Sequence, residues 1–181
     1  MTELPKVVLA PAMPCDAAVL SNLLELYSHD LSQVFALELG TNGRFGYERL
    51  PLYWSDPERR FPFLIRVGAR IAGFVLVTRG SPASDDPNSF DIAEFFVLRR
   101  YRRSGVGRQA AFLVWNRFAA HWIVRVSEGN KNGIQFWGNV IAEYTSGTAV
   151  ETTLPGSPHG WRVFSFNSTL RGRGERLSWP I

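Results

Sequence analysis

The sequence has very little cysteine and very little lysine. Cys15 is the only cysteine among 181 residues, and Lys6 and Lys131 are the only lysines among 20 basic residues. A single cysteine excludes an internal disulfide and is typical of the reducing cytoplasm. Long hydrophobic runs are also missing, since a run such as residues 71–77 is far shorter than the roughly 20 residues of a membrane-spanning helix. Residues 1–14 start acidic and are broken by prolines, unlike a signal peptide. We therefore expect a cytoplasmic protein with no membrane partner.

The remaining composition is ordinary for a folded protein. Hydrophobic residues make up 45% and charged residues 20%, and the length suits a single domain over residues 1–181. The net charge of +4 is carried mostly by arginine. This balance permits phosphate-bearing partners without requiring nucleic acid, and it can equally reflect genome composition. His29, His121 and His159 have no metal-ligand spacing, so we expect no bound metal.

Hydrophobic periodicity and turn residues indicate the secondary structure. Apolar positions at helical spacing follow Asp16, a good N-cap, and a tight-turn signal at residues 68–70 predicts a β-hairpin. The expected strands are residues 6–12, 61–67, 70–80, 90–98, 122–128, 148–153 and 161–168, and the expected helices are residues 17–35, 108–121 and 130–144. Residues 40–60 are expected to be irregular. The order predicts a mixed α/β fold around one central sheet.

Two glycines stand in an arginine-rich turn between the expected strand 90–98 and the helix after it; the stretch 99–111 reads RRYRRSGVGRQAA. Glycine lets phosphate oxygens approach the backbone, and the first N–H groups of a helix have no internal partners. The turn therefore predicts an anion site, with an ordinary helix cap as the alternative. It is not a Walker loop, and Ala110 stands where a G-x-G-x-x-G loop has its third glycine.

Two linked motifs resemble those of the GNAT superfamily of N-acetyltransferases. Residues 94–97 (EFFV) followed by Arg102-x-x-Gly105-x-Gly107 resemble the acetyl-coenzyme A signature of that superfamily. Residues 130–137 (NKNGIQFW) resemble its N-x-x-A-x-x-F-Y helix, with glycine in the alanine place and tryptophan in the tyrosine place. The resemblance follows the element order over residues 5–168 and is strongest over residues 90–140.

This resemblance implies a mixed, mostly antiparallel sheet flanked by helices, with a β-bulge in strand 90–98 and a gap between it and strand 122–127. Acetyl-CoA is the implied co-substrate, with pantetheine in the gap and pyrophosphate on the glycine turn. The implied cofactor-binding residues are Phe96, Val97, Arg102, Arg103, Ser104, Gly105, Val106, Gly107, Arg108, Asn130 and Trp137.

The resemblance also implies catalytic roles. Glu94 is the candidate general base, with Asp91 ranked below it, and the Val97 N–H is the candidate donor to the developing oxyanion. A tryptophan N–H does not titrate usefully, so Trp137 cannot replace a tyrosine as general acid. Tyr144, further along the same helix, is a weak candidate for that role. Otherwise the thiolate leaves unassisted, which thiol acidity near ~8.5 permits.

The acceptor pocket is expected to be built from residues 25–60 and the last strands. Its weak candidate residues are Tyr27, Asp30 and Tyr53, and behind them His29, Tyr47, Glu48 and Trp54, each of which also suits a core or surface position. The expected acceptor is an amine of a small molecule or a protein.

Two other functions remain open at this stage. The same fold without catalysis would be an acyl-CoA-binding module, which the missing tyrosine favours and Glu94 disfavours. A nucleic-acid-binding protein would use the arginines at 99–103 and at 171–179, but glycines before a helix suit a compact phosphate site better. An exposed strand edge would allow a homodimer.

Overall fold

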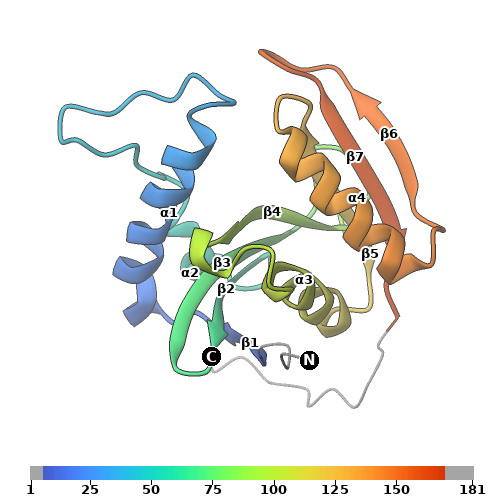
Figure 1. Cartoon of the computed structure of the whole chain (residues 1–181), viewed down its shortest axis with the longest axis horizontal. Helices are drawn as coiled ribbons and strands as arrows, with labels where there is room; N and C mark the ends of the chain where they lie inside the picture. Colours follow the sequence, from blue (N-terminus) through green and yellow to red (C-terminus); the bar gives the residue numbers. More distant parts are fainter. Residues whose placement is uncertain (1–5, 170–181) are drawn as a thin grey trace.

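The computed structural model describes residues 6–169, which form one seven-stranded sheet with helices on both faces (Figure 1). The strands are β1 (Val7–Pro11), β2 (Arg60–Val67), β3 (Arg70–Arg79), β4 (Phe90–Val97), β5 (His121–Ser127), β6 (Val150–Leu154) and β7 (Trp161–Asn167); the helices are α1 (Ala17–Leu31), α2 (Leu52–Ser55), α3 (Val106–Arg117) and α4 (Lys131–Thr145), with 3₁₀ turns η1 (Pro14–Asp16) and η2 (Arg99–Tyr101). The strand order is β1-β2-β3-β4-β5-β7-β6, and every pair except β4–β5 is antiparallel. This confirms the predicted mixed, mostly antiparallel sheet.

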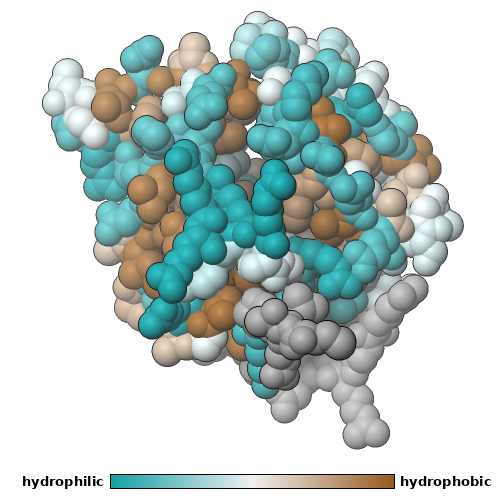
Figure 2. All heavy atoms as spheres, viewed as in Figure 1, coloured by the Kyte–Doolittle hydropathy of each residue, from teal (hydrophilic) through white to brown (hydrophobic). Residues whose placement is uncertain are grey.

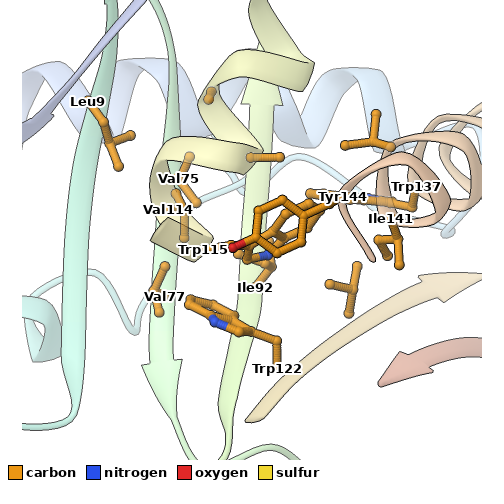
Figure 3. Close-up of a cluster of buried hydrophobic side chains, with 14 of the residues drawn as sticks. Leu9, Val75, Val77, Ile92, Val114, Trp115, Trp122, Trp137, Ile141 and Tyr144 are labelled. Atoms are coloured by element: carbon orange, nitrogen blue, oxygen red, sulfur yellow. The ribbon is translucent and has the colours of Figure 1, made fainter. Parts of the chain in front are cut away.

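Alternation along the central strands divides the core into two halves. Phe63 and Val75 point to one face and pack with α3 and α4, where Trp115 and Tyr144 meet (Figure 3). Phe74, on the other face, packs with α1 and α2. The sheet is therefore the middle layer of three.

The sheet opens between β4 and β5, as the sequence predicts. The two strands pair only where they start, at Phe90 with Trp122 and at Asp91 with Ile123. Beyond these pairs they diverge, and the edge of β4 faces a gap instead of a neighbouring strand.

A β-bulge in β4 decides which way its carboxylates point. Leu76 on β3 pairs with Glu94, whereas Val77 pairs with Ile92, so Ala93 is the extra residue. Without it, Ile92 and Glu94 would face the same side of the sheet. The bulge turns Glu94 away from the α3–α4 core and toward α1, onto the face that Asp91 also shares.

The chain departs from expectation mainly at helix ends. The first helix ends at Leu31 and not at residue 35, and its N-cap, Asp16, makes no side-chain cap because its carboxylate accepts the N–H of Met13 at 2.9 Å. Helix α3 starts at Val106, two residues before the start of the expected helix 108–121. The short helix α2 lies within the stretch expected to be irregular, over Leu52–Ser55.

Candidate functional site

A groove of about 1000 Å³ runs beside the open edge of β4. Its walls come from the end of α1, the second half of β4, the turn into α3 and the first turns of α4. Nine of the predicted cofactor-binding residues line it: Phe96, Val97, Arg102, Arg103, Gly105, Gly107, Arg108, Asn130 and Trp137. Figure 2 shows hydrophilic side chains gathered at the middle of this face, over the segment between β4 and α3.

The turn into α3 exposes backbone donors to the groove. Arg103 and Gly105 take the left-handed conformation, with φ of 59° and 81°, and Gly105 is the N-cap of α3. The amide of Gln109 donates to Gly105 at 3.0 Å, so the three amides before it precede the first helical hydrogen bond. Val106 is fully buried, and its side chain belongs to the core. The turn thus offers amides and the positive end of a helix dipole to an anion.

Most guanidinium groups at this turn are occupied by carboxylates. Arg99 (2.7 Å) and Arg102 both bind Asp30, and Arg102 Nε donates to the Val97 carbonyl at 2.7 Å. Arg108 Nε donates to Glu143 on α4 at 2.7 Å. The paired arginine side chains therefore stabilise the walls of the groove, and the backbone amides of the turn are the donors that remain available to a ligand. Asp30, predicted as a weak acceptor-site residue, lies among these arginines in the groove. Burial opposes ionisation of Asp30, but hydrogen bonds from the two arginines outweigh it and lower its pKa.

Val97 presents its backbone to the gap. Leu98 donates its N–H to Ala72 on β3 at 2.8 Å. Because successive peptide groups of a strand point to opposite edges, the N–H of Val97 points away from β3, as does its carbonyl, which binds Arg102. This geometry suits the role predicted for the Val97 amide.

The start of α4 explains one departure from the family motif. The Asn130 side chain caps the helix by accepting the N–H of Gly133 at 2.9 Å. A Cβ on Gly133 would lie 2.6 Å from that side chain, so an alanine would displace the cap. Trp137, in the usual tyrosine place, is buried against Phe95, with ring centroids 4.9 Å apart.

Glu94 is held by two tyrosines from different segments. Tyr27 on α1 donates to one carboxylate oxygen at 2.6 Å, and Tyr47 donates to the other at 3.0 Å. Burial raises the pKa of Glu94 above its ordinary value of 4.5, and these two hydrogen bonds and the charge of Arg125 partly offset the rise. Burial and the nearby carboxylate also raise the pKa of Tyr27. The site therefore contains a positioned carboxylate and two protonated phenols.

Asp91 and Arg125 form an ion pair close to Glu94. Asp91 is fully buried and accepts Arg125 Nε at 2.8 Å and Nη2 at 3.2 Å; it also accepts the hydroxyl of Ser81. These contacts satisfy both oxygens of Asp91, which fits a structural role better than a catalytic one. Sequence reasoning missed Arg125, although an arginine inside the apolar strand WIVRV was a usable signal.

A second cavity, of about 560 Å³, adjoins Glu94 on the α2 side of the sheet. Of the weak acceptor-site candidates, Tyr47 and Tyr53 line it, and Tyr53 lies beneath the Arg60 guanidinium at 5.5 Å. Trp54 instead donates its ring N–H to the Ala12 carbonyl, so it acts in packing. His29 and Glu48 line neither cavity.

Tyr144 lies away from both cavities, contrary to its predicted role as a fallback acid. Its ring packs against Trp115 at 4.9 Å in the core between α3 and α4 (Figure 3), and its hydroxyl donates to Asn116 at 2.9 Å. Helical spacing from Trp137 suggested a common face, but that face points into the core. Ser104 also uses its side chain structurally, donating to the Tyr101 carbonyl at 2.8 Å.

The arginine-rich segment 171–179 lies outside the residues that the structure describes. Within residues 6–169, no helix is both long enough and apolar enough to cross a membrane, and no group of three potential metal ligands is found.

Three solved structures that share this fold are acetyltransferases. An acetyltransferase of Thermus thermophilus is 20% identical, with a TM-score of 0.68 over 91% of this chain and 100% of that chain. The spermidine N-acetyltransferase of Vibrio cholerae, solved with CoA and spermine, is 12% identical, with a TM-score of 0.62 over 90% and 95%. The ribosomal-protein-S18-alanine N-acetyltransferase of Escherichia coli is 16% identical, with a TM-score of 0.56 over 96% and 100%.

The sequence itself matches a family model. No curated protein matches the chain. The model of the acetyltransferase (GNAT) family matches residues 22–138, a span that starts within α1 and ends within α4. Because this span covers more than half of the chain and contains the gap, the glycine turn and Glu94, the protein belongs to the acetyltransferase (GNAT) family.

Proposed function

We propose that this protein transfers an acetyl group from acetyl-CoA to an amine by direct attack, with both substrates bound at once. The observation that carries the proposal is the hydrogen bond between Tyr27 and Glu94. Tyr27 lines the large groove and Glu94 lines the smaller cavity, so the 2.6 Å bond joins the two spaces. A donor in one space and an acceptor in the other would meet at this carboxylate.

The groove suits coenzyme A in size and in chemistry. Its volume of about 1000 Å³ matches a large cofactor. The amides of the turn from Arg103 to Arg108 would hold the pyrophosphate, and the free edge of β4 at Phe96 and Val97 would hold the pantetheine arm. Gly107 lets the Phe136 ring pack closely against this wall, because a Cβ there would lie 3.2 Å from the ring. When bound, acetyl-CoA supplies the acetyl group as a thioester.

Glu94 is the group that removes a proton from the acceptor. An alkylammonium titrates near ~10 and has no lone pair for attack until it loses a proton. The raised pKa of Glu94 makes its carboxylate a better proton acceptor than an ordinary glutamate. As the nitrogen attacks, the new C–N bond forms, the C–S bond breaks, and the sulfur leaves as a thiolate that takes a proton from solvent.

The remaining groups position these steps. The Val97 N–H, pointing into the gap, is the donor we assign to the carbonyl oxygen as negative charge develops there. Tyr27 and Tyr47 fix the carboxylate and lower its pKa relative to an unpaired buried acid. Trp137 provides an apolar wall and no titrating proton.

The direct test is thiol release from acetyl-CoA over a panel of amines, with wild type and Glu94→Gln. The variant should lose about 100-fold or more in kcat while its calorimetric affinity for acetyl-CoA stays unchanged. Unchanged turnover in Glu94→Gln would remove Glu94 as the base. Acetyl-CoA binding without transfer to any amine would instead favour the non-catalytic acyl-CoA-binding module.

We also propose a domain organisation, a cellular location and a dimer contact. We propose that residues 1–181 form one domain, since a single sheet links β1 to β7. A cytoplasmic location is supported by the lone Cys15. The edge strand β6 is exposed, with Val150 58% and Leu154 39% accessible, and would be the contact in a homodimer.

A further inference from the structure

Three charged side chains from β4 and β5 lie on the face of the sheet that α1 and α2 cover. On β4, Asp91 stands between two residues of the α3–α4 core and so points to the other face, which the bulge also gives to Glu94. On β5, Arg125 stands between Val124 and Val126, which pack in the α3–α4 core, so it points the same way as the two carboxylates.

The pairing of β4 with β5 places Arg125 beside both carboxylates. Asp91 pairs with Ile123 in the parallel ladder, which ends there. Two residues further along the two strands stand Ala93 and Arg125, and Glu94 follows directly. The Arg125 guanidinium reaches back to Asp91, which accepts Nε at 2.8 Å and Nη2 at 3.2 Å. The ion pair therefore spans the sheet where the strands begin to separate.

The guanidinium of Arg125 is fixed by more than this ion pair. Asp91 is fully buried and also accepts the hydroxyl of Ser81, so the carboxylate is itself anchored. Arg125 lies over the ring of Trp161 on β7, 5.6 Å from its centroid. Phe35, just beyond the end of α1, stacks with that ring at 6.0 Å. These contacts hold the positive charge in one place.

Glu94 is the group that this charge affects. Glu94 and Arg125 line the same smaller cavity. Burial raises the pKa of Glu94, which favours the neutral acid, and a neutral acid cannot accept a proton. Of the charges nearby, Arg125 has the larger effect and lowers this pKa, whereas Asp91 has the smaller effect and raises it. The ion pair therefore acts on Glu94 mainly through its positive member.

The other groups around Glu94 do not supply this charge. Tyr27 from α1 and Tyr47 from the loop before α2 are neutral donors to its oxygens, and Tyr53 of α2 is a third phenol nearby. The other charged residues that line the cavity are of both signs: Arg49, Asp56, Arg59, Arg60, Arg79, Asp85 and Asp86. None of these seven is among the main influences on the pKa of Glu94.

We propose that Arg125 is a positioning residue of the reaction: held by Asp91 across the opening of the sheet, its guanidinium keeps Glu94 ionised and ready to take the proton of the acceptor. This inference rests on the proposed function. Arg125 acts through Glu94 and lines the smaller cavity but not the groove. Its removal should therefore change the pH at which Glu94 works and leave the affinity for acetyl-CoA unchanged.

The experiment changes the charge and measures the ionisation of Glu94. Arg125→Met removes the cation, Arg125→Lys keeps it, and Asp91→Asn removes the carboxylate alone. Because a buried charge without its partner destabilises a fold, the neutral pair Arg125→Met/Asp91→Asn is included. The matched control is Arg162→Met on the neighbouring strand β7, since Arg162 is paired with Glu151 and lines neither cavity.

Two readouts follow the same group. The first is the pH dependence of kcat/KM with an amine that the wild type acetylates. The second is a carboxyl ¹³C NMR titration of glutamate-labelled protein, with the Glu94 signal assigned from Glu94→Gln, which needs no acceptor. Calorimetry with acetyl-CoA checks that each variant still binds the cofactor.

In Arg125→Met, the titration midpoint of Glu94 and the rising limb of kcat/KM should move about one pH unit higher, because the buried carboxylate loses its cation. Arg125→Lys should recover part of this shift. Asp91→Asn should move both to lower pH, because a like charge is gone. The neutral pair should move them higher by less than Arg125→Met, since Arg125 has the larger effect. Arg162→Met should change neither.

An unshifted midpoint in Arg125→Met, or in the neutral pair if that variant does not fold, would overturn the proposal. Shifts in the same direction in Arg125→Met and Asp91→Asn would also overturn it, because they would indicate a loosened fold, as would a lysine variant that recovers nothing. If no amine is acetylated, the NMR titration decides alone. The predicted shifts would then support the role of the charge while refuting acetyl transfer, and equal midpoints would refute both.

Discussion

At the scale of single residues, Glu94 depends on the hydroxyl groups that bind it. Tyr27 and Tyr47 come from segments far from β4 in the sequence, 67 and 47 residues away. Sequence patterns identified Glu94 because it belongs to a local motif. They could rank the tyrosines only as weak acceptor-site candidates, because nothing local shows which distant side chains approach a strand. The partners of Asp30 escaped prediction for the same reason, since Arg99 and Arg102 lie 69 and 72 residues away.

Tyr27→Phe should shift the pH dependence of catalysis. A general base acts when deprotonated, so kcat/KM rises with pH through the pKa of Glu94. The hydrogen bond from Tyr27 lowers that pKa, so its loss raises the pKa further and moves the rising limb to higher pH. A pH–rate profile from about pH 5 to about pH 9 on wild type and variant measures the shift.

Tyr144→Phe is the matched control for this profile. It removes a hydroxyl that binds Asn116 in the core, so the free energy of unfolding should fall by about 1 kcal/mol while the limb stays in place. The interpretation of Glu94 fails if the profile of Tyr27→Phe is unshifted. A large loss of kcat in Tyr144→Phe would restore Tyr144 as an acid.

At the scale of elements, the order of helices and strands along the chain and the gap in the sheet were predictable, but the face of the sheet on which each side chain lies was predictable only in part. The resemblance implied the gap and a bulge, and alternation in β2 and β3 assigns each apolar residue to a core. Alternation alone would place Glu94 with Ile92 in the α3–α4 core. Only the extra residue, Ala93, reverses it.

Gly105→Glu should abolish cofactor binding at the turn into α3. A carboxylate there would oppose the pyrophosphate, and the left-handed backbone adds strain. Affinity for acetyl-CoA in calorimetry should fall about 100-fold. Gly68→Glu, at another left-handed glycine (φ 58°) in the β2–β3 turn, should carry a similar stability cost and bind normally. Equal affinities in the two variants would place the anion site elsewhere.

Gly73→Ala and Gly138→Ala should change stability in opposite directions. A Cβ on Gly73 would lie 1.9 Å from the Phe96 carbonyl, which forces β3 and β4 apart at a cost of about 1–3 kcal/mol. At Gly138, within α4, the nearest atom is the Phe164 ring at 4.0 Å, so alanine adds helix propensity of up to about 1 kcal/mol. Chemical denaturation measures both, and equal signs would refute the close approach of the strands.

At the scale of the whole molecule, arginines gather in two regions, and only some of them are paired with carboxylates. Within residues 6–169, the groove contains three arginines paired with carboxylates and the unpaired Arg103, and the smaller cavity contains two paired and three unpaired arginines. Composition predicted a net charge of +4 but not this division, because pairing with Asp30, Asp91 and Glu143 is set by tertiary contacts. A broad basic face for nucleic acid is disfavoured, since three of the five arginines around the glycine turn, Arg99, Arg102 and Arg108, are already bound to carboxylates.

Amide hydrogen exchange with and without acetyl-CoA tests the central claim most directly, because it reads every segment of the chain at once. If the groove between β4 and α4 is the cofactor site, acetyl-CoA should slow exchange on both of its walls. The protected peptides should cover residues 96–109 and 130–137, with the β2–β3 turn at residues 67–70 unchanged. Unaltered exchange at the glycine turn in the presence of saturating acetyl-CoA would contradict the account.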